Sequence, residues 1–201
     1  MARRPSVLPP WRLREEEIAG RGALGAVLAR RSEPKVDDRA PSDEELLPLV
    51  EAAGSVADHS ALRPWRLIAL RGEARERLGE ALVEAAGLTG EEADRLAGKP
   101  LRAPLLVAVV ASTEPHGKVP RWEQRAVAAG VAHTLSLLLD EAGWGVMWRT
   151  GPYVRSAPVE RLHRLERGER LLGWLYVGGR RGRATPSRRR PVDPERRLTS
   201  L

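Results

Sequence analysis

Cysteine is absent from this chain of 201 residues. Its absence excludes a disulfide framework, a zinc site built from thiolates and a cysteine nucleophile. Long hydrophobic runs are also missing, because the longest, LLVAVVA at residues 105–111, is too short to span a bilayer. The N-terminal sequence MARRPSVLPPWRLREEE has prolines and charges where a signal peptide needs an apolar core. These absences predict a cytoplasmic protein that does not insert into a membrane.

Lysine is scarce, since only three of the 34 basic residues are lysines. The formal net charge of +7 is also uneven. From residue 178 to the end, eight arginines stand against two acidic residues, so this tail carries +6 and the remainder of the chain +1. Such a tail can bind nucleic acid or an acidic partner through charge attraction. No recognised nucleic-acid-binding motif accompanies it, so we keep this binding only as a second alternative function.

Several catalytic motifs are absent as well. The sequence has no P-loop for phosphate, no G-x-S-x-G nucleophile elbow and no H-E-x-x-H metal pair. The string GRGALG at residues 20–25 has dinucleotide-binding spacing, but a charged, helical REEEIA precedes it where that fingerprint needs a strand. The histidines are too dispersed to indicate a metal site: His59, His116, His133 and His163. Hydrolytic and metal chemistry are therefore not indicated.

A hydrophobic share of 42% is enough for a packed core, and predicted helices alternate with predicted strands. Ser42, followed three residues later by Glu45, forms a capping box that predicts a helix ending at Gly54. The longest predicted helix runs from about Arg121 to Ala142 and has an apolar stripe. A short helix toward Arg31 is expected within REEEIAGRGALGAVLARRS at residues 14–32, and further helices are expected near residues 73–87 and 158–165. Strands are expected at 65–70, 105–112, 145–150 and 171–178.

This alternation predicts a single α+β domain with an arm at each end. We expect an N-terminal extension at residues 1–23, the domain itself at 24–179 and a basic, extended arm at 180–201. Prolines in the C-terminal arm disfavour a continuous helix there.

A series of short motifs carries the strongest functional signal. In chain order they are RRS at residues 30–32, DHSALRPWRLIAL at 58–70, HGKVPRWEQ at 116–124 and GWGVMWRTG at 143–151. With these motifs the chain resembles the FMN-dependent nitroreductases, specifically their compact YdjA-like branch, over about residues 24–179. The resemblance implies a nitroreductase-like fold: a central, mostly antiparallel sheet flanked by helices, a long central helix, and arms exchanged between the subunits of a homodimer.

The resemblance also implies a function. FMN would lie at the subunit interface, where both chains contribute to its site. NADH or NADPH would reduce the flavin in a ping-pong cycle, and the flavin would pass hydride to an acceptor such as a nitroaromatic compound, a quinone or an enone. Such an enzyme needs no acid–base pair, because the cofactor performs the chemistry and the protein binds and orients it. We therefore assign no catalytic side chain.

The first group of candidate cofactor residues is Arg30, Arg31 and Ser32. Guanidinium groups form charge-assisted hydrogen bonds with phosphate, and the serine adds a hydroxyl donor, which suits the phosphate or ribityl part of FMN. The residues alone also fit a solvated helix end, where arginines favour the negative dipole. Lys35 matches another basic position of the branch, where a cation would stabilise the anionic reduced ring.

The second group is Trp148, Arg149 and Thr150, at the end of a predicted strand. By resemblance this segment supplies backbone and side-chain donors to the flavin. The sequence alone equally allows Trp148 to pack in the core and Arg149 to reach solvent.

The third group lies in the loop before the strand at residues 65–70. By resemblance His59 contacts the flavin of the partner subunit, although a loop histidine can also cap backbone groups. Ser55 stands where the branch has arginine, and Ala57 where it has proline. Arg63 replaces a glutamine of the branch and could supply the missing charge. These departures support an alternative in which the chain is a non-enzymatic flavin-binding or degenerate family member.

Overall fold

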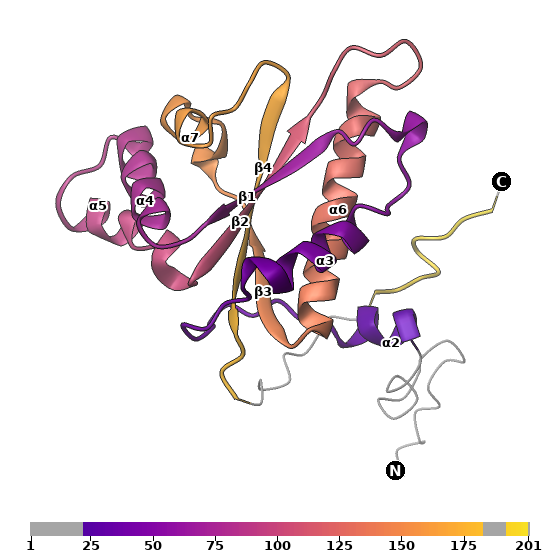
Figure 1. The fold of residues 1–201 in the computed structure, drawn as a ribbon, viewed down its shortest axis with the longest axis horizontal. Helices are drawn as coiled ribbons and strands as arrows, with labels where there is room; N and C mark the ends of the chain where they lie inside the picture. The colour runs from indigo at the N-terminus through magenta and orange to yellow at the C-terminus, as the bar shows by residue number, and fades with distance from the viewer. Residues whose placement is uncertain (1–21, 183–191, 201) are drawn as a thin grey trace, which may run out of the picture.

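The computed structural model describes residues 22–182 and 192–200, and a four-stranded antiparallel sheet lies at its centre (Figure 1). The strand order is β1–β2–β4–β3, and every neighbouring pair is antiparallel. This confirms the predicted α+β class and the antiparallel sheet. The strands are β1 (Trp65–Leu70), β2 (Leu105–Ser112), β3 (Trp144–Arg149) and β4 (Glu169–Gly179).

Helices cover both faces of the sheet (Figure 1). On one face lie α3 (Asp43–Ala53) and the long helix α6 (Arg121–Glu141). On the other face lie α4 (Glu73–Ala86), α5 (Gly90–Ala97) and α7 (Ala157–Leu162). The remaining helical segments in the described part of the chain are α2 (Gly22–Ala29) and three short 3-10 turns: η1 (His59–Ala61), η2 (Pro100–Arg102) and η3 (Pro152–Arg155).

Strand β2 joins the two layers. Its first seven residues are almost completely buried, and successive side chains point to opposite faces of the sheet. Leu105, Val107 and Val109 pack with α3 and α6, whereas Leu106, Ala108 and Val110 pack with α4, α5 and α7. A continuous apolar run is therefore explained by burial on both faces, as the sequence predicted.

The capping box predicted for α3 is present. Ser42 Oγ accepts a hydrogen bond from Glu45 N at 3.2 Å, and Glu45 Oε2 accepts one from Ser42 N at 2.8 Å. The long helix α6 is anchored near its first turn by Gln124, which is fully buried and accepts from Glu114 N. The Ser42–Glu45 contacts satisfy backbone N–H groups at the start of α3, and the Gln124 side chain ties α6 to the loop that precedes it.

The predicted N-terminal extension falls largely outside the described residues, and the predicted C-terminal arm falls partly outside them. Positions 1–21 of the expected N-terminal extension, and 183–191 and 201 of the expected C-terminal arm, lie outside them. The division into extension, domain and arm thus stays a proposal. Within the ranges that the structure covers, we find no helix with the length and apolar character needed to cross a membrane.

Candidate functional site

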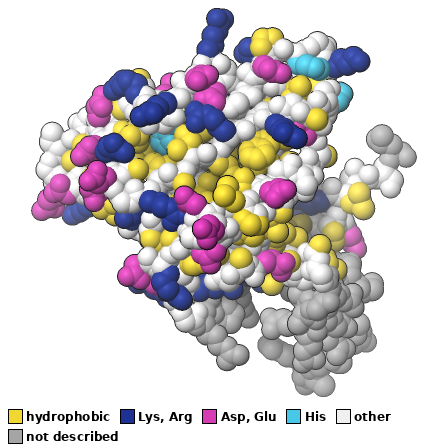
Figure 2. Space-filling model, in the orientation of Figure 1, with side chains coloured by type: hydrophobic (Ala, Val, Ile, Leu, Met, Phe, Trp, Pro, Cys, Tyr) yellow, Lys and Arg dark blue, Asp and Glu magenta, His cyan; other side chains and the backbone are white. Residues whose placement is uncertain are grey.

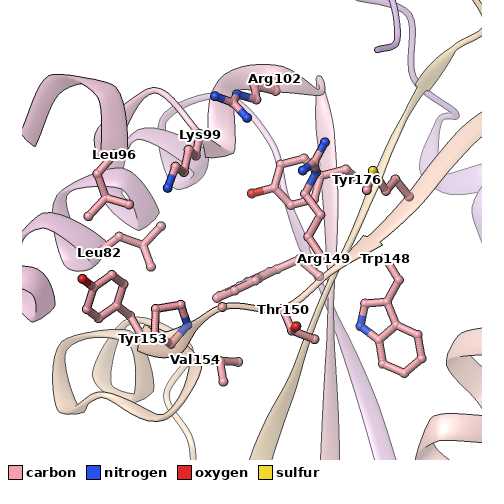
Figure 3. Close-up of a pocket in the computed structure, with 14 residues that line it drawn as sticks. Leu82, Leu96, Lys99, Arg102, Trp148, Arg149, Thr150, Tyr153, Val154 and Tyr176 are labelled. Atoms are coloured by element: carbon pink, nitrogen blue, oxygen red, sulfur yellow. The ribbon is translucent and has the colours of Figure 1, made fainter. Parts of the chain in front are cut away.

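A cavity of about 660 Å³ lies on the α4–α5 side of the sheet, where β3 ends (Figure 3). Its volume is in the range of small-molecule and cofactor sites. The aromatic residues Trp174 and Tyr176 of β4, and Tyr153 of η3, form part of its lining. The other lining residues are Leu82, Leu96, Lys99, Arg102, Met147, Trp148, Arg149, Thr150, Gly151, Pro152 and Val154.

Three cationic side chains line this cavity: Lys99, Arg102 and Arg149. The Arg149 guanidinium lies 5.2 Å from the centroid of the Tyr176 ring, a cation–π contact that fixes its direction. Its Nε is buried and has no hydrogen-bond partner among the described residues. Burial raises the pKa of Tyr176, so its phenol stays a neutral hydrogen-bond donor. The cavity therefore offers positive charge and donors to an anionic or acceptor-rich ligand.

The chain segment after the RRS motif runs beside the end of β3. Glu33 N donates to Val146 O at 3.0 Å, and Arg149 Nη2 donates to Pro34 O at 3.5 Å. Gly178 permits this close approach, because a Cβ there would lie only 2.6 Å from Val36 Cγ2. The fold thus brings the segment that directly follows RRS next to the second group of predicted residues, although the two are more than a hundred residues apart in the sequence.

Within the RRS motif, Arg31 turns back onto its own helix. Its Nη1 donates to Leu28 O at 2.5 Å, Ala29 O at 3.1 Å and Arg30 O at 2.9 Å. These carbonyls belong to the C-terminal end of α2, where a cation is favourable. Arg31 therefore has the helix-end geometry that the sequence allowed as an alternative. Arg30 is half-buried, and Ser32 and Lys35 are exposed.

Trp148 and Arg149 point to opposite sides of the sheet (Figure 3). The Trp148 ring turns away from the cavity and meets His133 of α6 edge-on, with ring centroids 5.0 Å apart. The ring packs against the α3–α6 core, which is one of the two placements of Trp148 that the sequence allowed. Trp148 is still among the residues that line the cavity. Arg149 does not extend into solvent, because it is half-buried over Tyr176.

The third predicted group lies elsewhere, beside α6. His59 Nδ1 is 2.9 Å from Glu123 Oε1, and both residues line a second hollow of about 540 Å³ that shares no residue with the cavity. Ser55 Oγ donates to Ala52 O at 2.7 Å, so its side chain faces its own helix. Within one chain, the loop at residues 55–63 is therefore not part of the cavity.

The backbone of this loop is unusual. Ser60, Ala61 and Arg63 all have positive φ, at 67°, 51° and 48°, although none is glycine. Asp58 Oδ2 accepts a hydrogen bond from Arg63 N at 2.6 Å and helps to hold the turn. Left-handed conformations of this kind cost free energy and are concentrated at functional sites.

Lys99, Arg102, Tyr153 and Tyr176 were not among the residues predicted for the site. Lys99 and Arg102 belong to the sequence GKPLR, just before the buried strand β2. A signal was available, because Lys99 is one of only three lysines and stands beside a strand entrance. Tyr176 lies inside an apolar strand, where it is indistinguishable from a core residue by pattern alone.

Comparison with known proteins gives consistent results. The profile described as "Nitroreductase family" matches residues 27–179. The chain is 33% identical over 159 residues to "Putative NAD(P)H nitroreductase YdjA" of Escherichia coli (strain K12), covering 78% of this chain and 87% of that protein.

Solved structures share the fold. A nitroreductase-like family protein from Bacillus cereus superposes with a TM-score of 0.76 at 23% identity, covering 88% of this chain and 94% of that one. A variant of the FMN- and NADPH-dependent nitroreductase NfnB, from sphigopyxis sp. strain HMH, superposes with a TM-score of 0.67 at 19% identity, covering 87% and 96%.

Proposed function

Because this chain belongs to the nitroreductase family, we propose that it is an FMN-dependent NAD(P)H oxidoreductase. In this proposal the flavin accepts hydride from NADH or NADPH and passes it, in a ping-pong cycle, to a nitroaromatic, quinone or enone acceptor. The E. coli relative is described as an NAD(P)H nitroreductase, and NfnB as an FMN- and NADPH-dependent nitroreductase. These names support the cofactor assignment.

The observation that carries the proposal is the cationic cavity at the end of β3. Phosphate and the oxygen-rich edge of a flavin ring need donors and positive charge, and the apolar body of the ring needs an aromatic or aliphatic wall. Lys99, Arg102 and Arg149 meet the first need, and Trp174 with Leu82 meets the second. The unpartnered Arg149 Nε is a donor that a bound ligand would satisfy. The residues present therefore fit FMN.

We further propose that the working form is a homodimer with the flavin site at its interface. The loop at residues 55–63 is separate from the cavity within one chain, so its proposed flavin contact requires a second copy. Figure 2 shows apolar side chains gathered over α3 and α6, and Leu47 of α3 is 65% exposed. Leu24 and Val27 of α2 are also exposed, at 47% and 50%. Covering such a surface favours association.

The absorbance spectrum of the purified protein with added FMN is the direct test of this function. A bound flavin that NADH or NADPH bleaches, and that an acceptor restores, supports the enzyme. A bound flavin that neither nucleotide bleaches supports the non-enzymatic alternative suggested by Ser55 and Ala57. No flavin binding at all contradicts both.

Arg149→Met should weaken FMN binding about tenfold, because a hydrogen bond to a charged group contributes about 1.5–3 kcal/mol. Methionine keeps much of the side-chain length and removes only the charge and the donors. Titration of flavin fluorescence measures the dissociation constant. Arg155→Met is the matched control, since Arg155 is exposed and does not line the cavity. Equal affinities in both variants would remove Arg149 from the site.

Replacing Arg30 and Arg31 together with alanine should raise the dissociation constant of FMN about thirtyfold, if they hold its phosphate. The geometry of Arg31 supplies a competing explanation, because this side chain caps α2. Riboflavin, which lacks the phosphate, separates the two. Loss of FMN binding with unchanged riboflavin binding indicates phosphate contact, whereas parallel losses indicate only a damaged helix end.

A further inference from the structure

His163 and Trp174 form a buried pair behind the cavity. His163 is the last residue of the turn that closes α7 and is 3% exposed, and Trp174 lies in β4 and is 4% exposed. Trp174 Nε1 lies 3.0 Å from His163 Nε2, and His163 Nδ1 lies 2.7 Å from Val159 O. Trp174 also lines the cavity. The histidine thus connects the α7 backbone to the cavity wall.

The contacts define which nitrogen of His163 carries the proton. An indole N–H can only donate, so His163 Nε2 must be the unprotonated acceptor. A backbone carbonyl can only accept, so Nδ1 must carry hydrogen toward Val159 O. The imidazole is therefore neutral and in a single tautomer. Burial lowers the pKa of His163, in agreement with this neutral form.

The local shape of β4 makes Trp174 dependent on such a contact. The pairing of β4 with β2 passes from Gly173 opposite Val109 to Leu171 opposite Val110, so Leu172 is a bulge with no partner. A bulge breaks the ladder locally and bends the strand, which re-aims the following side chains. Beside this break, the hydrogen bond to His163 restricts the direction of the indole ring.

We propose that His163 is a positioning residue that, as the neutral Nδ1–H tautomer, fixes the Trp174 indole as a rigid wall of the cavity. This role rests on the proposed function, in which that wall contacts the flavin. Pre-organised walls improve affinity because less side-chain freedom is lost on binding. His163 touches no ligand in this proposal and acts only through Trp174.

Protonation would break the arrangement. An imidazolium has two donors and no acceptor, so it cannot receive the Trp174 N–H. Arg66 of β1 lies beside His163: its Nη2 is 3.4 Å from His163 O, and its charge also disfavours a cation there. Glu169 of β4 neutralises Arg66, and on the outer side of α7 Glu84 of α4 pairs with Arg161. Once the pH falls below the lowered pKa of His163, the wall should therefore loosen as the imidazole takes up a proton.

The experiment compares His163→Gln and His163→Leu. Glutamine can donate to Val159 O and accept from Trp174, whereas leucine can do neither. At pH 8 we expect about tenfold weaker FMN binding in His163→Leu and affinity within twofold of wild type in His163→Gln. Between pH 8 and pH 5 the FMN phosphate itself titrates, near pH 6. His163→Gln shares that phosphate effect but has no imidazole, so only the wild type should show an additional loss of affinity.

A second measurement does not use the flavin. In ¹⁵N-labelled protein without FMN, the indole N–H signal of Trp174, assigned by its absence in Trp174→Phe, should exchange slowly with solvent at pH 8. Its protection, taken relative to the intrinsic exchange rate of an exposed indole at the same pH, should be lower at pH 5 than at pH 8 in the wild type and low at both pH values in His163→Leu. Trp174→Phe keeps a ring but not the N–H, so it should weaken FMN binding and remove the additional pH effect.

The outcomes separate the two proposals. A wild type that binds no FMN contradicts the proposed function and, with it, the role of His163. A wild type that binds FMN, with His163→Leu and Trp174→Phe equal to it at every pH, contradicts only the positioning role. Protection of the Trp174 indole N–H that is equal at pH 8 and pH 5 and is unchanged in His163→Leu contradicts the positioning role as well.

Discussion

Gly173→Ala is expected to lower the free energy of unfolding by about 4 kcal/mol and to displace the end of β3. A Cβ at this position would lie 2.5 Å from Arg149 O and 2.8 Å from Trp148 Nε1. The φ of Gly173 is +131°, a backbone conformation that residues other than glycine rarely adopt. The costs of backbone strain and of overpacking therefore add at this residue. One of the two atoms in the way, Arg149 O, belongs to the backbone and cannot move aside by a side-chain rotation.

Urea denaturation of the variant and wild type measures this loss. FMN titration should show weakened binding at the same time, because Arg149 and Thr150 would move relative to the cavity. Gly117→Ala is the matched control, since its Cβ would meet nothing within 4 Å and its φ is not in the left-handed range. If Gly173→Ala unfolds at the same urea concentration as Gly117→Ala, the contact between β3 and β4 at Gly173 has room for a Cβ and this prediction is wrong.

Glu169→Gln should lower the free energy of unfolding by about 2 kcal/mol at pH 7, because it breaks a bidentate ion pair and leaves without a partner the charge of Arg66, whose side chain is 38% exposed and partly screened by water. Both carboxylate oxygens of Glu169 lie 2.6 Å from Arg66 nitrogens, and Ser112 Oγ donates to Oε1 at 2.8 Å. The Glu169 side chain is 10% exposed. Glu166→Gln is the control, since Glu166 is an exposed neighbour that contributes only its backbone N–H to Glu169.

The same pair predicts how stability depends on pH. The hydrogen bonds from Arg66 lower the pKa of Glu169 from 4.5 to about 2. The folded protein therefore holds this carboxylate ionised at pH values where the unfolded chain would protonate it. The stabilisation is fully present above pH 4.5 and is lost as the pH falls from 4.5 toward 2. Acid unfolding curves of the wild type should show this loss, and those of Glu169→Gln should lack it.

Local signals predicted the fold well where one interaction decides the structure. The capping box of Ser42 and Glu45 was correct to the residue, because both partners are close in sequence. The run at residues 105–112 gave a strand buried on both faces, since no other element of that length is so uniformly apolar. Helix α5 was not predicted. Its sequence GEEADRLA contains one large apolar residue, Leu96, and tertiary packing rather than periodicity holds it in place.

The candidate site was less predictable, because it depends on contacts between distant segments. Alternation along a strand predicts that Trp148 and Arg149 face opposite sides, but it does not say which side holds a cavity. That side is determined by α5 and η2, which bring Lys99 and Arg102 to the end of β3. The cap that Arg31 forms on α2 was one of two geometries compatible with RRS. Whether these residues hold FMN stays a prediction.

The central sheet divides this molecule into two parts that could be redesigned separately. The cavity belongs to the layer of α4, α5 and α7, whereas the exposed apolar surface belongs to α2, α3 and α6. Ligand preference could then be altered through Leu82, Leu96 and Tyr153 without repacking the opposite layer. The turn from β3 into η3 is the exception, because Trp148 packs against the layer of α3 and α6 and Arg149 lies over Tyr176 on the cavity side. A mutational library that spares residues 147–151 would keep the two layers independent.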